Sequence, residues 1–165
     1  MPITSKTPKK AIEQIIQRRI NYLIQRMIET LCYVGEEVIK YARDPDRRRY
    51  IDRTGNLTSS IGYVVLNEGE VVVESSFKPV AASELKRDKK DATPIDGLTG
   101  SAEGEAFLNK LKSENPTGLA LIVVAGMPYA KLVEAKGFDV LESAELETEE
   151  NVKRALKKLM GPKKK

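Results

Sequence analysis

The chain has 165 residues, of which 41% are hydrophobic and 32% charged, with a formal net charge of +4. This length and composition are typical of one globular domain with a modest core, and the absence of tryptophan leaves that core mainly aliphatic. Histidine is absent and cysteine occurs once, at Cys32, which excludes histidine-based catalysis, an internal disulfide and a cysteine–histidine zinc site.

Nothing in the sequence points to a membrane. No apolar run approaches the ~20 residues of a membrane span, and the first residues lack the hydrophobic region of a signal peptide. We therefore expect no membrane contact and a protein that stays in the cytoplasm where it is made. Cys32 lies in an apolar helical stretch, so we expect a buried, inert thiol.

Residues 8–42 carry the clearest periodicity and predict one long helix. Thr7 is a suitable N-cap, Pro8 suits the first helical position, and Asp44-Pro45 ends the helix. Spacings of three and four place the apolar residues on one stripe, namely Ile12, Ile16, Ile20, Leu23, Met27, Leu31, Val34 and Val38.

Such a helix is about 50 Å long at ~1.5 Å per residue, which is more than a domain of this size can cover. Further isoleucines widen the apolar surface beyond the stripe: Ile15, Ile24, Ile28 and Ile39. We therefore expect part of the helix, with Ile24 and Ile28 at its side positions, to contact a neighbouring subunit. A helix covered entirely by its own sheet is the alternative.

A basic link follows over residues 47–53. Arg47, Arg48 and Arg49 can neutralise phosphates and Tyr50 can stack on a base, whereas a solvated or salt-bridged link is the favoured interpretation. The lysine-rich ends, 1–7 and 160–165, are expected to be mobile basic tails.

Residues 54–56 predict a turn, and residues 57–61 a single helical turn. Two β-branched runs come next, at 61–66 and 71–75, joined by a short segment with a glycine. This pattern indicates a β-hairpin.

Apolar residues thin out over 77–118, which we interpret as an insertion with a lid or contact role. Within it, 101–112 predicts a partial helix with Phe107, Leu108 and Leu111 as its apolar edge, and 80–104 is expected to be mobile, with first protease cuts near Lys86, Arg87, Lys89 and Lys90. The glycines Gly97, Gly100 and Gly104 lack the preceding strand and the G-K-[ST] ending of a phosphate cradle.

The last third of the chain predicts two strands and two helices. The continuous apolar run 119–125 indicates a central strand buried on both faces, 129–135 a short helix ended by Gly137, and 138–141 a short strand. A C-terminal helix carries glutamates early and lysines late. The expected fold is one α+β domain over 1–165, in which the long N-terminal helix packs on a small, mostly antiparallel sheet of hairpin plus central strand, with a C-terminal helix.

Three polar groups have residue types that could form a chemical site, and each has a better structural interpretation. Asp44 and Asp46 flank a proline at a helix stop. Ser59 and Ser60 have no histidine base, and the glutamates of the C-terminal helix match its dipole. We expect no catalytic residue, cofactor or metal.

Two segments resemble a known pair of motifs. Arg53-Thr54-Gly55-Asn56-Leu57-Thr58-Ser59-Ser60-Ile61 is similar to an R-T-G-x-L-x-x-S-I turn that leads into a hairpin, and Tyr129-Ala130-Lys131-Leu132-Val133-Glu134 to a later Y-A-x-x-V-E segment. Together they resemble the signature of the neck proteins of tailed bacteriophages, the tail-completion or head-to-tail joining family.

The resemblance implies a structural virion protein without catalysis, assembled as a homo-oligomeric ring at the junction of head and tail. Its partners would be other neck, portal or tail proteins, with genomic DNA passing the ring, and it would be found in the virion and, during assembly, in the host cytoplasm. The matching positions are Arg53, Thr54, Gly55, Leu57, Tyr129, Ala130, Val133 and Glu134.

Two structural roles are expected within these segments. Gly55 should adopt a positive φ, and Glu134 should pair with a basic residue such as Arg53. A different class of function stays open, in which Arg47 to Arg53 and the lysine tails make the chain a basic nucleic-acid-binding or regulatory accessory protein.

Overall fold

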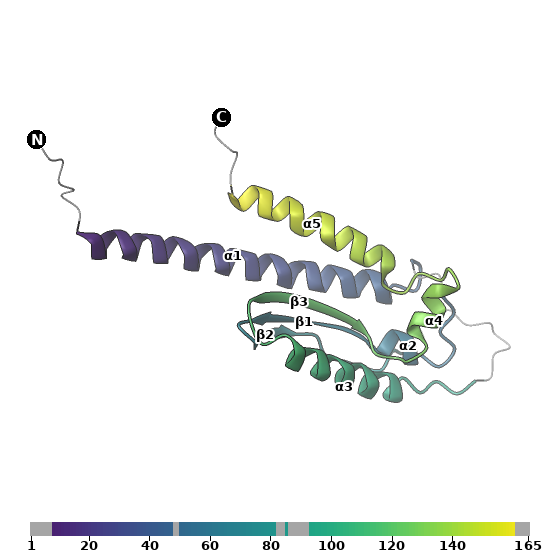
Figure 1. The fold of residues 1–165 in the computed structure, drawn as a ribbon. Coiled ribbons are helices and arrows are strands. Elements are labelled where there is room, and N and C mark those ends of the chain that lie inside the picture. Colours follow the sequence, from purple (N-terminus) through teal and green to yellow (C-terminus); the bar gives the residue numbers. More distant parts are fainter. Residues whose placement is uncertain (1–7, 48–49, 82–84, 86–92, 161–165) are drawn as a thin grey trace, which may run out of the picture.

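The structure is a computed structural model, and it describes residues 8–47, 50–81, 85 and 93–160. Thr7, Arg48, Arg49 and the expected cleavage sites between 86 and 90 lie outside the described residues. So do the expected tails 1–7 and 160–165, except Met160, which is the last residue of a helix and was wrongly assigned to a tail. A three-stranded sheet lies between helices, with α1 and α5 over one face and α3 over the other (Figure 1). The predicted α+β fold, with its long N-terminal helix, small antiparallel sheet and C-terminal helix, is confirmed.

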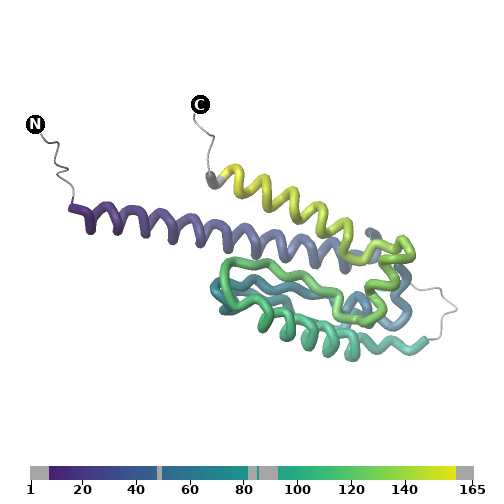
Figure 2. Tube along the Cα trace, in the orientation of Figure 1, coloured from purple at the N-terminus to yellow at the C-terminus, as the bar shows by residue number. Residues whose placement is uncertain are grey.

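Helix α1 spans Lys9–Arg43, with Pro8 at its N-cap and Asp44 at its C-cap. Its apolar positions repeat at spacings of four, four and three, so that Ile12, Leu23 and Val34 begin successive eleven-residue units. A repeat of eleven residues over three turns stays on one side of a nearly straight helix. The tube in Figure 2 shows α1 reaching well past the rest of the domain.

The hairpin forms as predicted, from β1 at Ile61–Asn67 and β2 at Glu70–Glu74. Glu68 and Gly69 both have positive φ, 52° and 78°, which is the geometry of a two-residue turn that matches strand twist. The sheet order is β2-β1-β3, with both pairs antiparallel.

Strand β3, Leu119–Ala125, is a strand as predicted but lies at an edge of the sheet. The central strand is β1, whose residues 61–66 are all buried. The prediction of a central position was wrong because a continuous apolar run indicates only that both faces of a strand are covered. It does not show whether the strand has a hydrogen-bonded neighbour along both of its edges. Helices cover both faces of β3, with Leu121 and Val123 towards α1 and Val124 towards α3.

Helix α3, Leu98–Glu114, forms a layer of the core and is not a separate lid. Leu108 is fully buried against Val64 and Leu66 of β1, and Leu111 packs beside it, whereas Phe107 is largely exposed. The predicted apolar edge is therefore right for the two leucines and wrong for Phe107. Because α3 covers the sheet, residues 98–104 do not belong to a mobile segment.

Glycines let α3 approach its neighbours at backbone distance. A Cβ atom on Gly100 would lie 2.0 Å from the carbonyl oxygen of Asn56, and one on Gly104 would lie 2.6 Å from that of Ser60. These glycines are packing positions and do not form a phosphate cradle.

The C-terminal part contains α4, Ala130–Ala135, and α5, Glu142–Met160, both as predicted. No strand forms at 138–141. Val140 is instead buried in the core, and the backbone N–H of Leu141 donates to the side chain of Glu134 near the end of α4. Among the described helices, none has the length and apolar character to cross a membrane.

Candidate functional site

The first motif segment is built around Asp52, immediately before the residues that carry the resemblance. Its Oδ1 accepts the N–H of Gly55 at 2.9 Å and its Oδ2 that of Thr58 at 2.7 Å. Asp52 is buried, and it closes the turn that begins α2, Asn56–Ser59. Gly55 has φ of 82°, which confirms the expected positive φ.

Residues of the same segment also anchor α3. The Oδ1 of Asn56 accepts the N–H of Gly100 at 3.0 Å, and the carbonyl oxygen of Thr54 accepts the N–H of Asp96 at 2.9 Å. Leu57 is buried in the main core, while Arg53 is exposed. Sequence reasoning missed Asp52 and Asn56, although an aspartate shortly before a glycine turn is a common local cap.

The second segment caps another helix. Glu134 Oε1 accepts the backbone N–H groups of Leu141 and Glu142, each at 2.9 Å. These groups lie at the N-terminus of α5, where a carboxylate also interacts favourably with the helix dipole. The prediction that Glu134 pairs with Arg53 assigned this carboxylate the wrong partner, because the chain after α4 turns back and presents its own N–H groups.

The structure brings the two segments together. Leu57 and Ala130 belong to one core cluster. Ser60, near the end of the first segment, bonds to the residues just before the second: its carbonyl oxygen accepts the N–H of Gly126 at 3.0 Å, and its Oγ accepts the N–H of Met127 at 3.3 Å. The pKa of Tyr129 is raised, first by burial and then by the nearby charge of Asp52.

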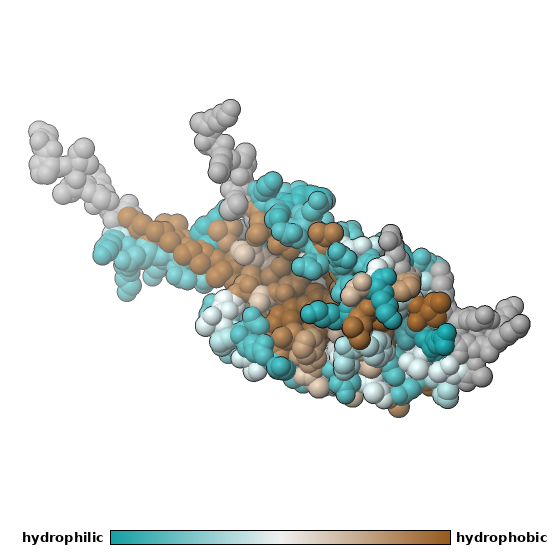
Figure 3. Space-filling model, turned by 45° about the vertical axis from the view of Figure 1, so that its right-hand side comes forward, coloured by the Kyte–Doolittle hydropathy of each residue, from teal (hydrophilic) through white to brown (hydrophobic). Residues whose placement is uncertain are grey.

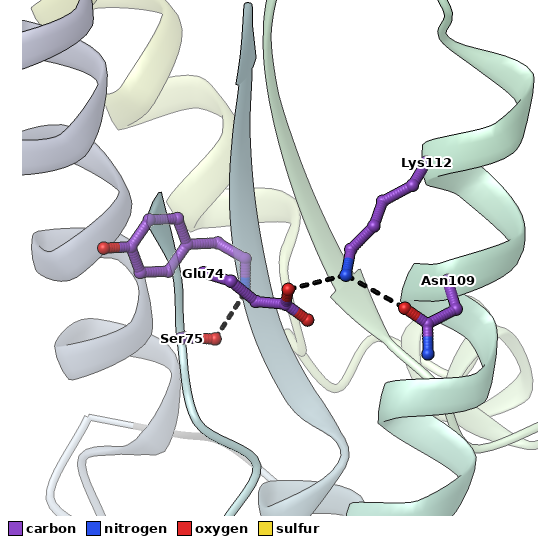
Figure 4. Close-up of polar contacts among 5 residues, drawn as sticks. Glu74, Ser75, Asn109 and Lys112 are labelled. Carbon is purple, nitrogen blue, oxygen red and sulfur yellow. Dashed lines mark hydrogen bonds and ion pairs between the residues drawn. The ribbon is translucent and has the colours of Figure 1, made fainter. Parts of the chain in front are cut away.

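Two further polar contacts, one part-buried and one exposed, also hold elements to one another. The hydroxyl of Tyr63 donates to Glu36 of α1 at 2.6 Å, and burial followed by this carboxylate raises the tyrosine pKa. On the opposite face, Lys112 of α3 contacts Glu74 of β2 at 2.6 Å and Asn109 at 2.9 Å (Figure 4).

The remaining groups that could carry chemistry are Cys32, the acidic residues and Arg47. Burial, followed by the charge of Glu36, raises the pKa of the Cys32 thiol, so the nucleophilic thiolate is disfavoured. In the part of the chain that the structure describes, His, Cys, Asp and Glu form no group of three placed to hold a metal ion. Arg47, for which a phosphate contact was the alternative to a salt-bridged link, has its Nε 3.5 Å from Oδ2 of Asp44 and its guanidinium over the ring of Tyr41.

The most unusual surface is the first half of α1, residues 9–26, which we call the arm. Its stripe residues Ile12, Ile16 and Ile20 are 42%, 53% and 42% exposed. Figure 3 shows a continuous apolar band along the projecting helix. Further along α1 the same stripe is buried, at Val34 and Val38.

The two predicted interface residues, Ile24 and Ile28, differ in their exposure, because they lie where the arm meets the domain. Ile24 is 37% exposed, as an interface position requires, but only 9% of Ile28 is exposed. Ile28 was wrongly assigned to a subunit interface, because its own chain already covers it.

The polar part of the arm is strongly basic. It carries five basic residues, Lys9, Lys10, Arg18, Arg19 and Arg26, and a single acidic one, Glu13. Arg26 pairs with Glu29 at 2.6 Å, and Arg19 lies over the ring of Tyr22. The arm is therefore an amphipathic helix with one apolar stripe and a positive remainder.

Two hollows flank α5. One, of about 350 Å³, lies between α5, α1 and β3, and we call it the α5–β3 groove; its lining residues are Val38, Leu121, Val123, Leu141, Glu145 and Thr148. The other, of about 500 Å³, lies between α1 and α5 and is lined by charges of both signs, including Glu37, Lys40 and Arg154.

Comparison of the chain with known protein families, with curated proteins and with solved structures finds no match.

Proposed function

We propose that this chain is a ring-forming structural subunit of the neck of a tailed bacteriophage, which joins the head or portal to the tail. The observation that carries the proposal is the arm, a helical extension whose apolar stripe is left open by its own subunit. Exposed apolar surfaces of this kind mark interaction sites.

The energetics favour a contact with another protein. Burying an isoleucine side chain completely is worth roughly 1.5–3 kcal/mol, and the stripe residues are about half exposed, so covering them contributes on the order of 1 kcal/mol each. A closed ring repeats the contact at every subunit, so a modest gain per contact is sufficient to hold the assembly.

The two motif segments support a structural role. Matched residues are used inside the fold, since Thr54 accepts the N–H of Asp96 before α3, Gly55 donates to the buried Asp52 and Glu134 caps α5. Residues that the neck family would supply for architecture thus have architectural contacts in this chain.

Sedimentation velocity and negative-stain micrographs of the purified protein test the proposal. We expect a closed ring for the natural chain and monomers for a variant with Ile12→Ser, Ile16→Ser and Ile20→Ser. The matched control is Gln14→Ser with Gln17→Ser, on the polar side of the same helix, which should still form rings. A natural chain that stays monomeric over the micromolar range contradicts the homo-oligomeric ring.

The place in the virion needs a separate observation. Antibody labelling of phage particles that carry this protein should mark the junction between head and tail. Label confined to the capsid shell or to the tail tip, or absent from particles, would contradict a neck protein.

The basic side of the arm favours one alternative, binding of nucleic acid. The two functions differ in their response to salt, because an interface dominated by phosphate contacts weakens steeply as salt rises. Rings that persist without DNA from 0.1 to 0.5 M salt support the neck subunit, whereas monomers that bind DNA only at low salt support the alternative.

A further inference from the structure

We propose that the arm of one subunit docks into the α5–β3 groove of the next copy of this chain. The proposal rests on the self-association stated above and specifies its contact surface. It joins two different surfaces of the same molecule, so each subunit can donate an arm to one neighbour and accept an arm from the other.

Connectivity requires the contact to be between copies. Helix α1 is continuous from Lys9 to Arg43, and Val38, near its other end, lines the groove. A straight helix cannot fold its first half back onto its own second half, and Figure 1 shows the arm pointing away from the sheet. A head-to-tail contact of this type closes into a ring when the rotation between subunits allows it.

The groove suits side chains from a helix lying along it. One turn of a helix ~10 Å wide and ~5.4 Å long occupies roughly 400 Å³, which exceeds the groove volume of about 350 Å³. The groove therefore receives side chains and not the whole helix. Its floor is aliphatic, with Leu121 and Val123 from β3 and Leu141 before α5, and the arm offers isoleucines at successive turns.

Complementary charge favours the arm as the occupant of the groove. Residues 142–150 of α5 contain five glutamates and no lysine or arginine, and all five glutamates are exposed. Glu145 lines the groove, and Glu142 and Glu149 are three residues before and four after it, on the same side of the helix. The strongly basic arm complements this acidic rim.

On the arm, Arg19 is the natural partner for that rim. It follows Ile16 by three residues and precedes Leu23 by four, which places it beside the apolar stripe. Within the described part of the chain, no ion pair involves Arg19, Glu142 or Glu145. Among the described residues, Arg19, Glu142 and Glu145 thus present charge that no ion pair of the subunit neutralises, whereas Glu149 of the rim is paired with Lys153.

Directed disulfide cross-linking tests the contact in a Cys32→Ser background. One preparation carries Ile12→Cys, Ile16→Cys or Ile20→Cys, the other carries Thr148→Cys in the groove, and the two are mixed, allowed to exchange subunits and oxidised. We expect a mixed dimer with at least one arm position, because a disulfide forms only when Cα atoms come within about 7 Å. The matched control, Gln17→Cys on the polar side, should give none.

Charge reversal supplies an independent measurement. Arg19→Glu should weaken self-association about threefold or more, and Glu145→Lys in the same chain should restore it, since exposed ion pairs contribute up to about 1 kcal/mol. Loss without restoration would count against the pairing of these two residues.

The outcomes separate this inference from the proposed function. Rings that persist but show no arm-to-groove disulfide, or arm variants that link only to one another, overturn the groove contact and leave the ring intact. If neither the natural chain nor the Cys32→Ser variant associates, both the groove contact and the ring are overturned.

Discussion

Removal of the Asp52 carboxylate should destabilise the domain far more than removal of a comparable carboxylate at the surface. In Asp52→Ala, the N–H groups of Gly55 and Thr58 lose their acceptor in a buried turn. An unsatisfied buried donor costs about 1–3 kcal/mol, so the two together predict a loss of roughly 2–6 kcal/mol in the free energy of unfolding. For a chain of this length, each kcal/mol lowers the melting temperature by about 2–4 °C, so the expected decrease is roughly 4–24 °C.

Asp96 is the matched control. It also accepts bonds at the start of a helix, from the N–H of Leu98 at 3.2 Å and the hydroxyl of Thr99 at 2.7 Å, but it is exposed. Water can replace it there, so Asp96→Ala should lose only a small fraction of the stability lost in Asp52→Ala. Urea unfolding of the natural chain and both variants at one protein concentration measures the difference. Equal losses would refute the argument that burial makes the Asp52 turn decisive.

Four further outcomes follow from the contacts described. Gly104→Ala should lower the free energy of unfolding by about 1–3 kcal/mol, because overpacking against Ser60 outweighs a gain of ~1 kcal/mol in helix propensity; increased stability in urea would show that α3 can move away. Glu134→Ala should lower the free energy of unfolding by about 1 kcal/mol and raise amide exchange in the first turn of α5 before other regions. Unchanged exchange there would contradict the capping role of Glu134. The raised pKa of Tyr63 means that folding favours its protonated hydroxyl, so this group's contribution to the free energy of unfolding is complete below about pH 10, the unfolded pKa, and is lost as the pH rises above that value. Between pH 8 and 10.5 the Tyr63→Phe variant should therefore lose less stability than the natural chain, and identical losses would contradict this. Cys32 should react with a thiol reagent at pH 8 more slowly than free cysteine and reach the free rate in urea, while an equal rate in the folded state would show that the thiol is accessible.

Local patterns were enough to predict most elements. The helix expected over 8–42 occurs at Lys9–Arg43, since its apolar spacing and the proline at each end are properties of adjacent residues. The hairpin follows from two β-branched runs and one glycine turn, and the positive φ of Gly55 from its turn sequence. Periodicity and turn chemistry act over a few residues, so a single chain shows them directly.

Contacts between distant segments could not be predicted in the same way. The edge position of β3, the role of α3 as a layer of the core and the cap that Glu134 provides for α5 all depend on which elements come to lie side by side. The glycines of α3 likewise appeared to be loop residues until their distances to Asn56 and Ser60 were known.

The arm shows both contributions within one helix. By itself the sequence determined that a single apolar stripe runs along α1 and that it is longer than a small domain can cover. Only the tertiary structure decided where cover ends, between the exposed Ile24 and the buried Ile28, which lie one turn apart. The physical reason is that periodicity reports which side of a helix is apolar, whereas burial at each turn depends on how far the sheet and α5 extend beside it.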